Sequence, residues 1–402
     1  MPSWLKQHTA CSQWRTICNN SCKAIEPSKI QLERLFHLND RVALEVWPLS
    51  CTSAPMARHG HGIEPNPRAT ERIKMAIKVP ESPASVSYET RRNHEKYERL
   101  LERAQALPPL PTAVAHPCDE SSLTAAVDAA RAGLLIPLLV GPGAKIKAVA
   151  ENAGLDLAGM EIVDVPHSHA AAERAVELAR QGRAEALMKG SLHSDELLGE
   201  VMKRDTGLRT ARRISQCFIM DVPDYAEALI ITDAAVNIAP TLEEKADIVR
   251  NAIDLAHSLG VTEVRVAILS AVETVNPSMP STIEAAALCK MADRGQITGG
   301  TLDGPLALDN AISAEAARIK GIRSSVAGRA NVLVAPDLEA ANMLAKSLSF
   351  LAKADAAGIV LGARVPIILT SRADSVTTRL ASCAVASLVA KALRESPKKA
   401  IA

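Results

Sequence analysis

From about residue 110 onward, short apolar runs alternate with amphipathic stretches, and this alternation constrains the fold more than any other feature of the chain. Continuous apolar runs are typical of strands buried on both faces, as in parallel sheets covered by helices. The pattern therefore predicts an α/β fold with mainly parallel sheets. The predicted strands are 112–116, 134–140, 161–165, 185–188, 214–220, 228–232, 264–269, 299–302, 331–335 and 365–370.

The helices between these strands carry their own start and stop signals. Thr241 followed by Glu244 predicts a capping box at a helix N-terminus. Gly260 is a natural residue to end that helix. Further helices are predicted over 89–106, 121–132 and 167–181. The apolar residues of the helix after Thr241 fall on one face: Leu242, Ala246, Val249, Ile253 and Ala256.

The first 90 residues differ from the rest of the chain. They contain all three tryptophans, have poor hydrophobic periodicity, and are interrupted by prolines. Residues 80–87 have the composition of a linker. No apolar segment of the kind found in secretory signals follows the early basic residues. We expect residues 1–90 to form an irregular extension that is disordered or only locally helical.

Charge and aromatic content exclude several classes of partner. Lys plus Arg total 46 and Asp plus Glu total 45, a net charge of +1, so no global field favours nucleic acid or an anionic membrane. With 3 Trp, 3 Tyr and 3 Phe, the chain lacks the aromatic platforms of a single-strand binder. No apolar run is long enough to predict a membrane-spanning helix. We expect neither a nucleic-acid nor a membrane partner.

The cysteines indicate reduced thiols in a cytoplasmic protein. Cys217, Cys289 and Cys383 lie in apolar segments and are far apart in sequence. The remaining cysteines and the histidines match no common metal-ligand spacing, so we expect no metal site.

Polar residues beside glycine or proline follow several predicted strands. Ligands of parallel α/β sheets bind beyond the carboxyl ends of the strands. We therefore expect these loops to meet in one groove. They contain Lys189, Gly190 and Ser191; Asp233 and Asn237; Asp303, Gly304 and Pro305; Asp337; and Ser371, Arg372 and Asp374.

The residue types in these loops suit an anionic substrate. A guanidinium such as that of Arg372 can bind a phosphate bidentately, and the neighbouring Ser371 hydroxyl can donate a hydrogen bond. Lys189 beside Gly190 offers a cation next to bare backbone. Each feature also has an ordinary structural explanation as a capped loop or a turn, which holds most strongly for Asp303.

Several common nucleotide and hydrolase motifs are absent from the sequence. There is no G-x-x-x-x-G-K-[ST] and no G-x-G-x-x-G after a strand, which weakens ATP or dinucleotide binding as a function. There is no H-E-x-x-H and no G-x-S-x-G elbow. We expect no tightly bound cofactor.

Five segments, taken in order, resemble the phosphate acetyl/butyryl transferase family. The resemblance covers about residues 94–395 and not the extension. The segments are Leu-Met-Lys-Gly-Ser-Leu-His-Ser-Asp-Glu-Leu-Leu at 187–198, Ile-Thr-Asp-Ala-Ala-Val-Asn at 231–237, Thr-Leu-Asp-Gly-Pro-Leu at 301–306, Val-Ala-Pro-Asp at 334–337, and Leu-Thr-Ser-Arg-Ala-Asp at 369–374.

The resemblance implies transfer of an acyl group between coenzyme A and inorganic phosphate, with acetyl-CoA or butyryl-CoA as substrate. It implies a two-domain fold of the isocitrate/isopropylmalate dehydrogenase type, with the C-terminal segment returning to the first domain. The domains would be 91–212 plus 366–402, and 213–365. A homodimer is also implied.

The resemblance also implies roles for individual residues. Ser371 would contact the carbonyl or thiol and Arg372 would hold phosphate. We expect Asp374 to orient the thiol or act as base, because Thr378 stands where acetyl-specific members have a catalytic aspartate. The substrate-binding residues would be Lys189, Gly190, Ser191, Asp303, Gly304, Pro305 and Asp337.

The chain departs from the acetyl-specific members at a second position. The helix near 196–202 lacks their arginine, for which Lys189, Arg204 or Arg213 could substitute. Together with Thr378, this favours the butyryl-like branch. Two alternative functions stay open: a non-catalytic acyl-CoA-binding protein, and an NAD(P)-dependent decarboxylating dehydrogenase of related fold.

Overall fold

The computed structural model describes residues 95–223, 225–371 and 374–395. The chain divides into two compact units, Met1–Pro83 and Ala84–Ala402, and all described residues belong to the second. The irregular extension predicted for residues 1–90 lies outside the described residues and stays a prediction.

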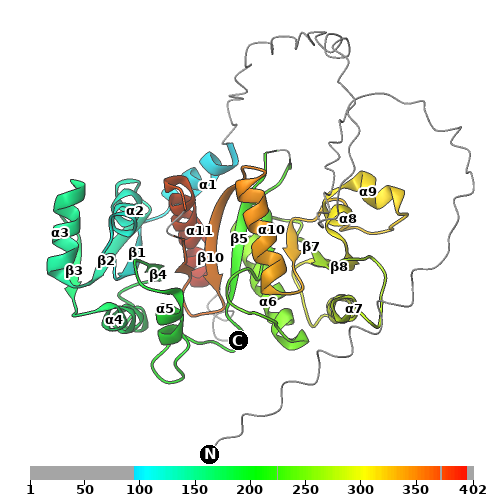
Figure 1. Ribbon diagram of the computed structural model, residues 1–402, viewed down its shortest axis with the longest axis horizontal. Helices are drawn as coiled ribbons and strands as arrows, with labels where there is room; N and C mark the ends of the chain where they lie inside the picture. The colour runs from blue at the N-terminus through cyan, green and yellow to red at the C-terminus, as the bar shows by residue number, and fades with distance from the viewer. Residues whose placement is uncertain (1–94, 224, 372–373, 396–402) are drawn as a thin grey trace, which may run out of the picture. The chain divides into compact units, whose positions relative to one another are not determined.

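The described strands form one continuous sheet of 11 strands (Figure 1). Their order is β3-β2-β1-β4-β11-β10-β5-β6-β9-β7-β8. Pairing is parallel except where β10 meets β11 and β5 and where β5 meets β6. The strands are β1 Leu110–Ala115, β2 Leu135–Gly141, β3 Glu161–Asp164, β4 Ala186–Lys189, β5 Ser215–Asp221, β6 Leu229–Thr232, β7 Arg265–Leu269, β8 Thr301–Leu306, β9 Val332–Val334, β10 Asp355–Leu361 and β11 Ile367–Ile368.

The C-terminal segment returns to the early strands, as predicted. Strand β11 pairs in parallel with β4, and β10 pairs antiparallel with β5. The antiparallel strands β10 and β5 thus join the two parallel halves of the sheet. The sheet continues through the predicted domain boundary at 212/213, and the division into two domains stays a prediction.

Helices cover both faces of the sheet. Buried side chains of α2, α6, α7 and α11 share one core, whereas those of α4 and α5 and those of α8 and α10 form two others. Figure 1 shows α10 in front of the central strands and α11 behind them. The helices are α1 Glu95–Gln105, α2 Glu120–Arg131, α3 Gly143–Ala153, α4 Ser168–Arg180, α5 Ser194–Val201, α6 Leu242–Ser258, α7 Pro280–Asp293, α8 Leu308–Ile312, α9 Ala314–Ile319, α10 Leu338–Phe350 and α11 Val376–Glu395.

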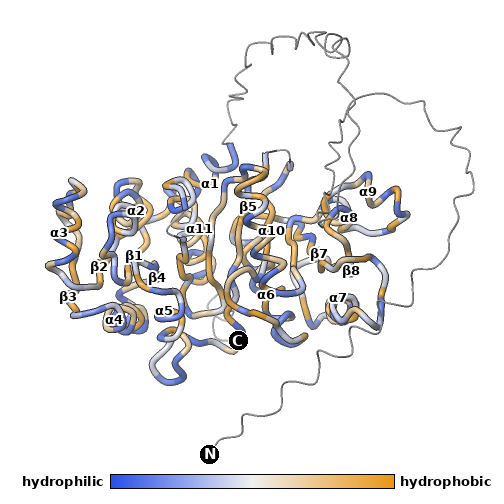
Figure 2. Tube along the Cα trace, viewed as in Figure 1, coloured by the Kyte–Doolittle hydropathy of each residue, from blue (hydrophilic) through white to orange (hydrophobic). Residues whose placement is uncertain are grey.

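Helix α11, with 20 residues, is the longest of the described helices. Among the described residues it is the one helix long and apolar enough to cross a membrane, and 56% of its apolar 18-residue stretch is buried. Residues 383–386 are fully buried in the core beneath the sheet. Its apolar composition is explained by its place in the core, where it packs against the sheet. In Figure 2 the central strands and α11 are largely hydrophobic, whereas blue segments concentrate in loops and at helix ends.

The structure confirms the helix that begins after Thr241. The Thr241 side chain accepts from Glu244 N and the Glu244 carboxylate accepts from Thr241 N, so the predicted capping box is present. Gly260, with φ +82°, follows the helix end as expected. Local signals were sufficient here because both partners lie within one turn of chain.

Two strands differ from the sequence-based prediction. Strand β10 was not predicted, because Asp355–Leu361 begins with alanines and a glycine, which carry little strand signal. Strand β8 runs to Leu306, so the prediction that it ends at residue 302 was wrong. Pro305 is tolerated there because β8 is the edge strand of the sheet.

Candidate functional site

The turn after β4 is fixed tightly against the end of β1. Gly190 N donates to Ala115 O and Ser191 N donates to His116 O, each at 2.9 Å. A Cβ at position 190 would overlap the backbone oxygens of both residues. Glycine is therefore required here for close approach of two backbones. Both amides thus donate to carbonyls at the end of β1. The expectation that the bare backbone at 190–191 would bind an anion through these N–H groups is therefore not supported.

Lys189 supplies the cation of this turn. Its ammonium donates to Gly190 O and Leu192 O, both at 3.3 Å. The two carbonyls flank Ser191 and hold the charge close to the strand end. The position of the ammonium thus depends on the shape of the turn.

The C-terminal turn lies beside Lys189, because β11 pairs in parallel with β4. Ser371 is exposed, and its amide donates to the Asp374 carboxylate at 2.6 Å. Asp374 N donates back to Ser371 O at 3.2 Å. Arg372 lies outside the described residues, so its predicted phosphate contact stays a prediction.

A small pocket collects residues from four parts of the chain. It is lined by Lys189 and Gly190, by Ser371, by Ser121 near the start of α2, and by Arg379 of α11. Arg379 Nη1 donates to Ser121 O at 3.3 Å, which ties α11 to α2. The predicted meeting of the 189–191 and Ser371 segments is therefore confirmed.

The Asp374 carboxyl is part buried and lies in the field of three cations. Burial raises its pKa above the ordinary value of 3.8. The Ser371 hydrogen bond and the charges of Arg379, Lys189 and Lys346 act in the opposite direction. These cations come from α11, β4 and α10, so three distant segments converge on one carboxylate. We call Lys189, Ser371, Asp374, Arg379 and Lys346 the strand-end cluster.

Thr378 occupies the position that the family resemblance gives to a catalytic aspartate. It is buried in the first turn of α11, and its Oγ1 accepts from Ser375 Oγ at 3.1 Å. Its backbone oxygen accepts from Ser382 Oγ at 2.7 Å. These contacts stabilise the helix start next to the cluster.

The structure does not bring the 303–305 segment to the cluster. Gly304 N donates to Asp303 Oδ1 at 2.8 Å, within β8. Strand β8 lies six strand positions from β11, about 29 Å along the sheet at about 4.8 Å per strand. The expectation that these loops meet was therefore wrong for 303–305, and their substrate contact stays a prediction.

The remaining strand-end residues have local structural partners. Asp337 caps α10 by accepting from Ala340 N at 2.8 Å. Asp233 is buried and accepts from four backbone amides and the Asn237 side chain. Burial raises the pKa of Asp233, and these hydrogen bonds oppose the rise.

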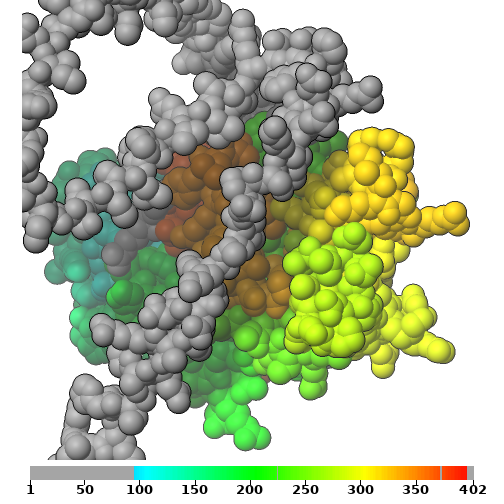
Figure 3. All heavy atoms as spheres, turned by 45° about the vertical axis from the view of Figure 1, so that its right-hand side comes forward, coloured from blue at the N-terminus to red at the C-terminus, as the bar shows by residue number. Residues whose placement is uncertain are grey.

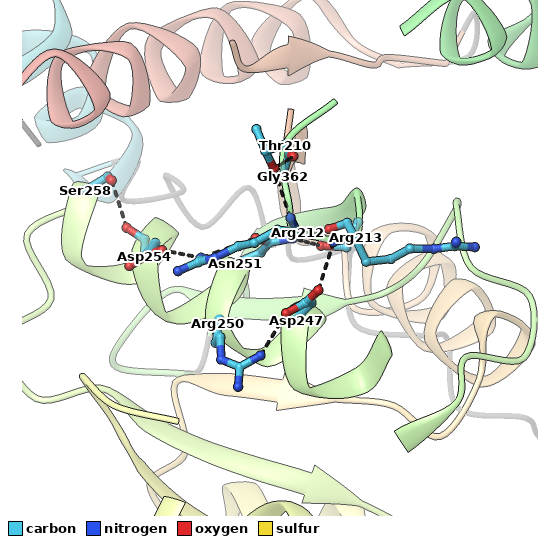
Figure 4. Close-up of polar contacts among 10 residues, drawn as sticks. Thr210, Arg212, Arg213, Asp247, Arg250, Asn251, Asp254, Ser258 and Gly362 are labelled. Carbon is cyan, nitrogen blue, oxygen red and sulfur yellow. Dashed lines mark hydrogen bonds and ion pairs between the residues drawn. The ribbon is translucent and has the colours of Figure 1, made fainter. Parts of the chain in front are cut away.

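Figure 4 shows where Arg213, one candidate for the missing arginine, is held. Its amide donates to Asp247 at 3.0 Å, and its guanidinium donates to Asn237 at 2.6 Å and pairs with Glu244 at 3.2 Å. Its neighbour Arg212 pairs with Asp254 at 2.5 Å. These arginines join the chain before β5 to α6. Of the three candidates, Lys189 lies in the strand-end cluster, and which of Lys189, Arg204 and Arg213 replaces the arginine stays a prediction.

Sequence reasoning missed Arg379 and Lys346. Each lies on a helix surface where a basic residue is common, and neither has a local motif. Their approach to Asp374 follows from packing of α10 and α11 on the sheet. No group of three or more metal-ligating side chains gathers in the described ranges.

The described cysteines are Cys118, Cys217, Cys289 and Cys383, all with free thiols. Burial raises the pKa of Cys217 and Cys383 to about 12, so both thiols stay protonated at neutral pH. They are part of the core, and none belongs to the strand-end cluster.

Comparison with known proteins gives three concordant matches. The family model described as Phosphate acetyl/butaryl transferase matches residues 167–387. A phosphate acetyltransferase of Rhizobium meliloti is 66% identical over 76% of this chain and 97% of the relative. A phosphate butyryltransferase of Clostridium beijerinckii is 42% identical over 74% of this chain and 98% of the relative.

Solved structures share the fold. A branched-chain phosphotransacylase from Enterococcus faecalis has a TM-score of 0.62 at 29% identity, covering 70% of this chain and 99% of the other. A phosphotransacetylase from Streptococcus pyogenes has a TM-score of 0.63 at 22% identity, covering 75% and 99%. The predicted α/β fold with a mainly parallel sheet is confirmed, and its likeness to the isocitrate/isopropylmalate dehydrogenase type stays a prediction.

The fold is thus that of the phosphotransacylase class of α/β enzymes. The chain belongs to the phosphate acetyl/butyryl transferase family. The predicted enzyme class, an acyltransferase that exchanges an acyl group between coenzyme A and phosphate, is confirmed.

Proposed function

We propose that acetyl-CoA is the main acyl substrate, with acetyl phosphate and coenzyme A as products. The support is similarity: four relatives named phosphate acetyltransferase are 56–66% identical. Two relatives named phosphate butyryltransferase are 42% identical, as is a phosphate acetyltransferase of Thermotoga maritima. The sequence-based preference for the butyryl-like branch rested on two departures from acetyl-specific members. The higher identity to relatives named phosphate acetyltransferase outweighs these two departures.

The strand-end cluster supplies the chemistry in our proposal. In the direction of acetyl-CoA synthesis, the sulfur of coenzyme A attacks the carbonyl carbon of acetyl phosphate. The S–C bond forms, the C–O bond to phosphate breaks, and phosphate leaves with the electron pair. Lys189 and Arg379, together with Arg372, bind the phosphate, because cations stabilise the charge that develops on it.

Asp374 accepts the thiol proton in this proposal. Thiols are mostly protonated at neutral pH, so a nearby base assists attack. Burial, which raises the Asp374 pKa, makes its carboxylate a better base than an exposed one. The Ser371 hydroxyl donates to the carbonyl oxygen. The single observation that carries the assignment is the pocket that brings Lys189 and Arg379 to Ser371, whose amide donates to the Asp374 carboxylate at 2.6 Å.

One assay separates this function from the alternatives. Release of coenzyme A is measured from acetyl-, propionyl- and butyryl-CoA, with and without phosphate. We expect phosphate-dependent release, with the highest kcat/KM for acetyl-CoA. Tight coenzyme A binding without turnover would indicate a binding protein, and NAD(P) reduction with a 2-hydroxy acid would indicate the dehydrogenase. A higher kcat/KM for butyryl-CoA would overturn the substrate assignment alone.

We further propose a cytoplasmic homodimer without a tightly bound cofactor. Part of α10 lies at the surface in Figure 3. It exposes Met343 and Phe350, which are 63% and 75% exposed, next to Leu351 at 82%. Such a patch on a folded surface favours association. Mass measured by light scattering on the intact protein and on Phe350→Glu tests this, and a wild-type monomer would contradict it.

A further inference from the structure

His116 follows β1 in an unusual backbone conformation. Its φ is +55°, in the left-handed region that a non-glycine residue seldom adopts. The backbone is held there by bonds on both sides: His116 N donates to Val140 O at 2.7 Å, and Cys118 N donates to His116 O at 2.8 Å. Strained positions of this kind cluster at functional sites.

The side chain of His116 contacts the turn after β4. Its Nδ1 lies 3.0 Å from Ser191 Oγ. The same Oγ donates to His116 O at 2.8 Å and accepts from Cys118 N at 3.3 Å. Ser191 has a single hydroxyl proton, and a carbonyl oxygen can only accept. That proton therefore goes to His116 O, and Nδ1–H is the donor to Ser191 Oγ.

This tautomer makes the contact insensitive to pH. The neutral imidazole keeps its lone pair on Nε2, and protonation there leaves Nδ1–H in place. The groups facing the ring are Lys145 of α3, Glu196 of α5 and Asp119 before α2. Burial lowers the His116 pKa, Lys145 lowers it further, and the two carboxylates oppose them. The ring is neutral at pH 7, and the hydrogen bond persists below its pKa.

The contact reaches the strand-end cluster through the turn. Ser191 lies between Gly190 and Leu192, whose carbonyls accept from the Lys189 ammonium. A displacement of Ser191 would therefore move both acceptors that hold this charge. We propose that His116 is a positioning residue that fixes Ser191 and thereby places the Lys189 ammonium for the phosphate substrate. The inference rests on the proposed phosphate role of Lys189.

Two substitutions separate the imidazole from the backbone conformation. His116→Gly accepts φ +55° but removes the donor. His116→Asn keeps a side-chain N–H near the Nδ1 position, and asparagine tolerates the left-handed region. We expect His116→Gly to raise the phosphate KM about tenfold, because small displacements in a binding site are costly. We expect kcat to change less, and His116→Asn to restore most of the lost affinity.

A double-mutant cycle with Lys189→Met tests whether His116 acts on phosphate binding through Lys189. If His116 acts through Lys189, His116→Gly should change the phosphate KM little in the Lys189→Met background. Thermal unfolding of every variant shows whether it is folded, and only folded variants with normal acetyl-CoA KM are compared. His116→Asn serves as the folded variant should His116→Gly unfold: a phosphate KM near that of the wild type supports the inference.

The outcomes distinguish the inference from the site proposal. A phosphate KM unchanged by Lys189→Met refutes the proposed role of Lys189. Where Lys189→Met does raise the phosphate KM, three results would overturn the positioning role of His116. The first is an unchanged phosphate KM in His116→Gly, and the second is an equally raised KM in folded His116→Asn. The third is full additivity of the two effects in the double variant.

Discussion

Single residues determine the shape of the two turns that meet at the strand-end cluster, the turn after β4 and the turn after β11. Gly190 is required by the close approach of β4 to β1. Asp374 organises Ser371 through two hydrogen bonds, one from the Ser371 amide to its carboxylate and one from its own amide to Ser371 O. Neither requirement involves the substrate directly. Both turns are therefore shaped by contacts of the protein with itself, which makes Gly190 and Asp374 informative to change.

Gly190→Ala should damage the turn even though it adds only one methyl group. The new Cβ would overlap backbone oxygens of Ala115 and His116, which cannot rotate away. We expect a loss of about 1–3 kcal/mol in unfolding free energy and a higher phosphate KM. Gly199→Ala is the matched control, because its Cβ meets nothing within 4 Å on helix α5. There we expect a gain of about 0.5–1 kcal/mol. Equal stability of both variants in urea would contradict the steric explanation.

Asp374 should set the acid limb of the activity profile. Its pKa is raised, so the carboxylate is lost at a higher pH than for an ordinary aspartate. Activity that needs the carboxylate therefore falls as the pH drops through this raised value. We expect Asp374→Asn to lower kcat about 10²-fold or more and to abolish this limb. The check is kcat/KM for coenzyme A between pH 4 and 8, and an unchanged limb in the variant would assign it to another group.

At the scale of elements, α11 connects the cluster to the core. Its first turn holds Thr378, and its buried middle packs against β10, where Ser382 Oγ accepts from Gly358 N at 2.9 Å. The same hydroxyl donates to Thr378 O. Ser382 thus links the sheet to the first turn of α11, which follows the segment that contains Asp374.

Ser382→Ala should be more destabilising than Ser387→Ala on the same helix. Removing Ser382 Oγ leaves the buried Gly358 N–H without its acceptor, which costs about 1–3 kcal/mol. Ser387 Oγ only donates, to Leu134 O and Cys383 O. Leu134 O also accepts from Leu110 N, so it keeps a partner when Ser387 is replaced. Denaturant unfolding of the two variants measures the difference, and similar midpoints would refute the argument.

Periodicity and local signals predicted most elements but not their neighbours in space. The capping box of α6 was predictable because Thr241 and Glu244 are three residues apart. Strand β10 was missed because its alanines and glycine give no strand pattern, although it is the strand that joins β11 to β5. Arg379 and Lys346 were missed because their approach to Asp374 depends on how α11 and α10 pack.

The order of strands also explains why only some of the loops that were predicted to share a groove meet. Residues 189–191 and Ser371 meet because β4 and β11 are neighbours, which the family resemblance anticipated. The 303–305 segment has the same strand-end composition but lies on the edge strand β8. Composition at strand ends identifies candidate residues, and the lateral order of strands decides which of them share a site.

At the scale of the whole molecule, the fold and activity are expected to reside in the second compact unit. The unit boundary falls between Pro83 and Ala84. The Rhizobium meliloti relative aligns over 306 residues, which is 97% of its own length but 76% of this chain. A protein of that length therefore carries the name phosphate acetyltransferase without a counterpart to about a quarter of this chain.

Removal of residues 1–88 should leave the enzyme folded and active. Every strand of the described sheet and the whole strand-end cluster lie beyond residue 95, so no described contact of the site is lost. We expect kcat and both KM values within about twofold of the full chain, and a Tm within a few degrees, since the core is unchanged. A second truncation, ending at residue 106, is the control: it removes α1, whose Lys96 pairs with Asp221 at 2.7 Å, and should lower the Tm. If the shorter deletion already gave insoluble or inactive protein, the first unit would be part of the functional fold.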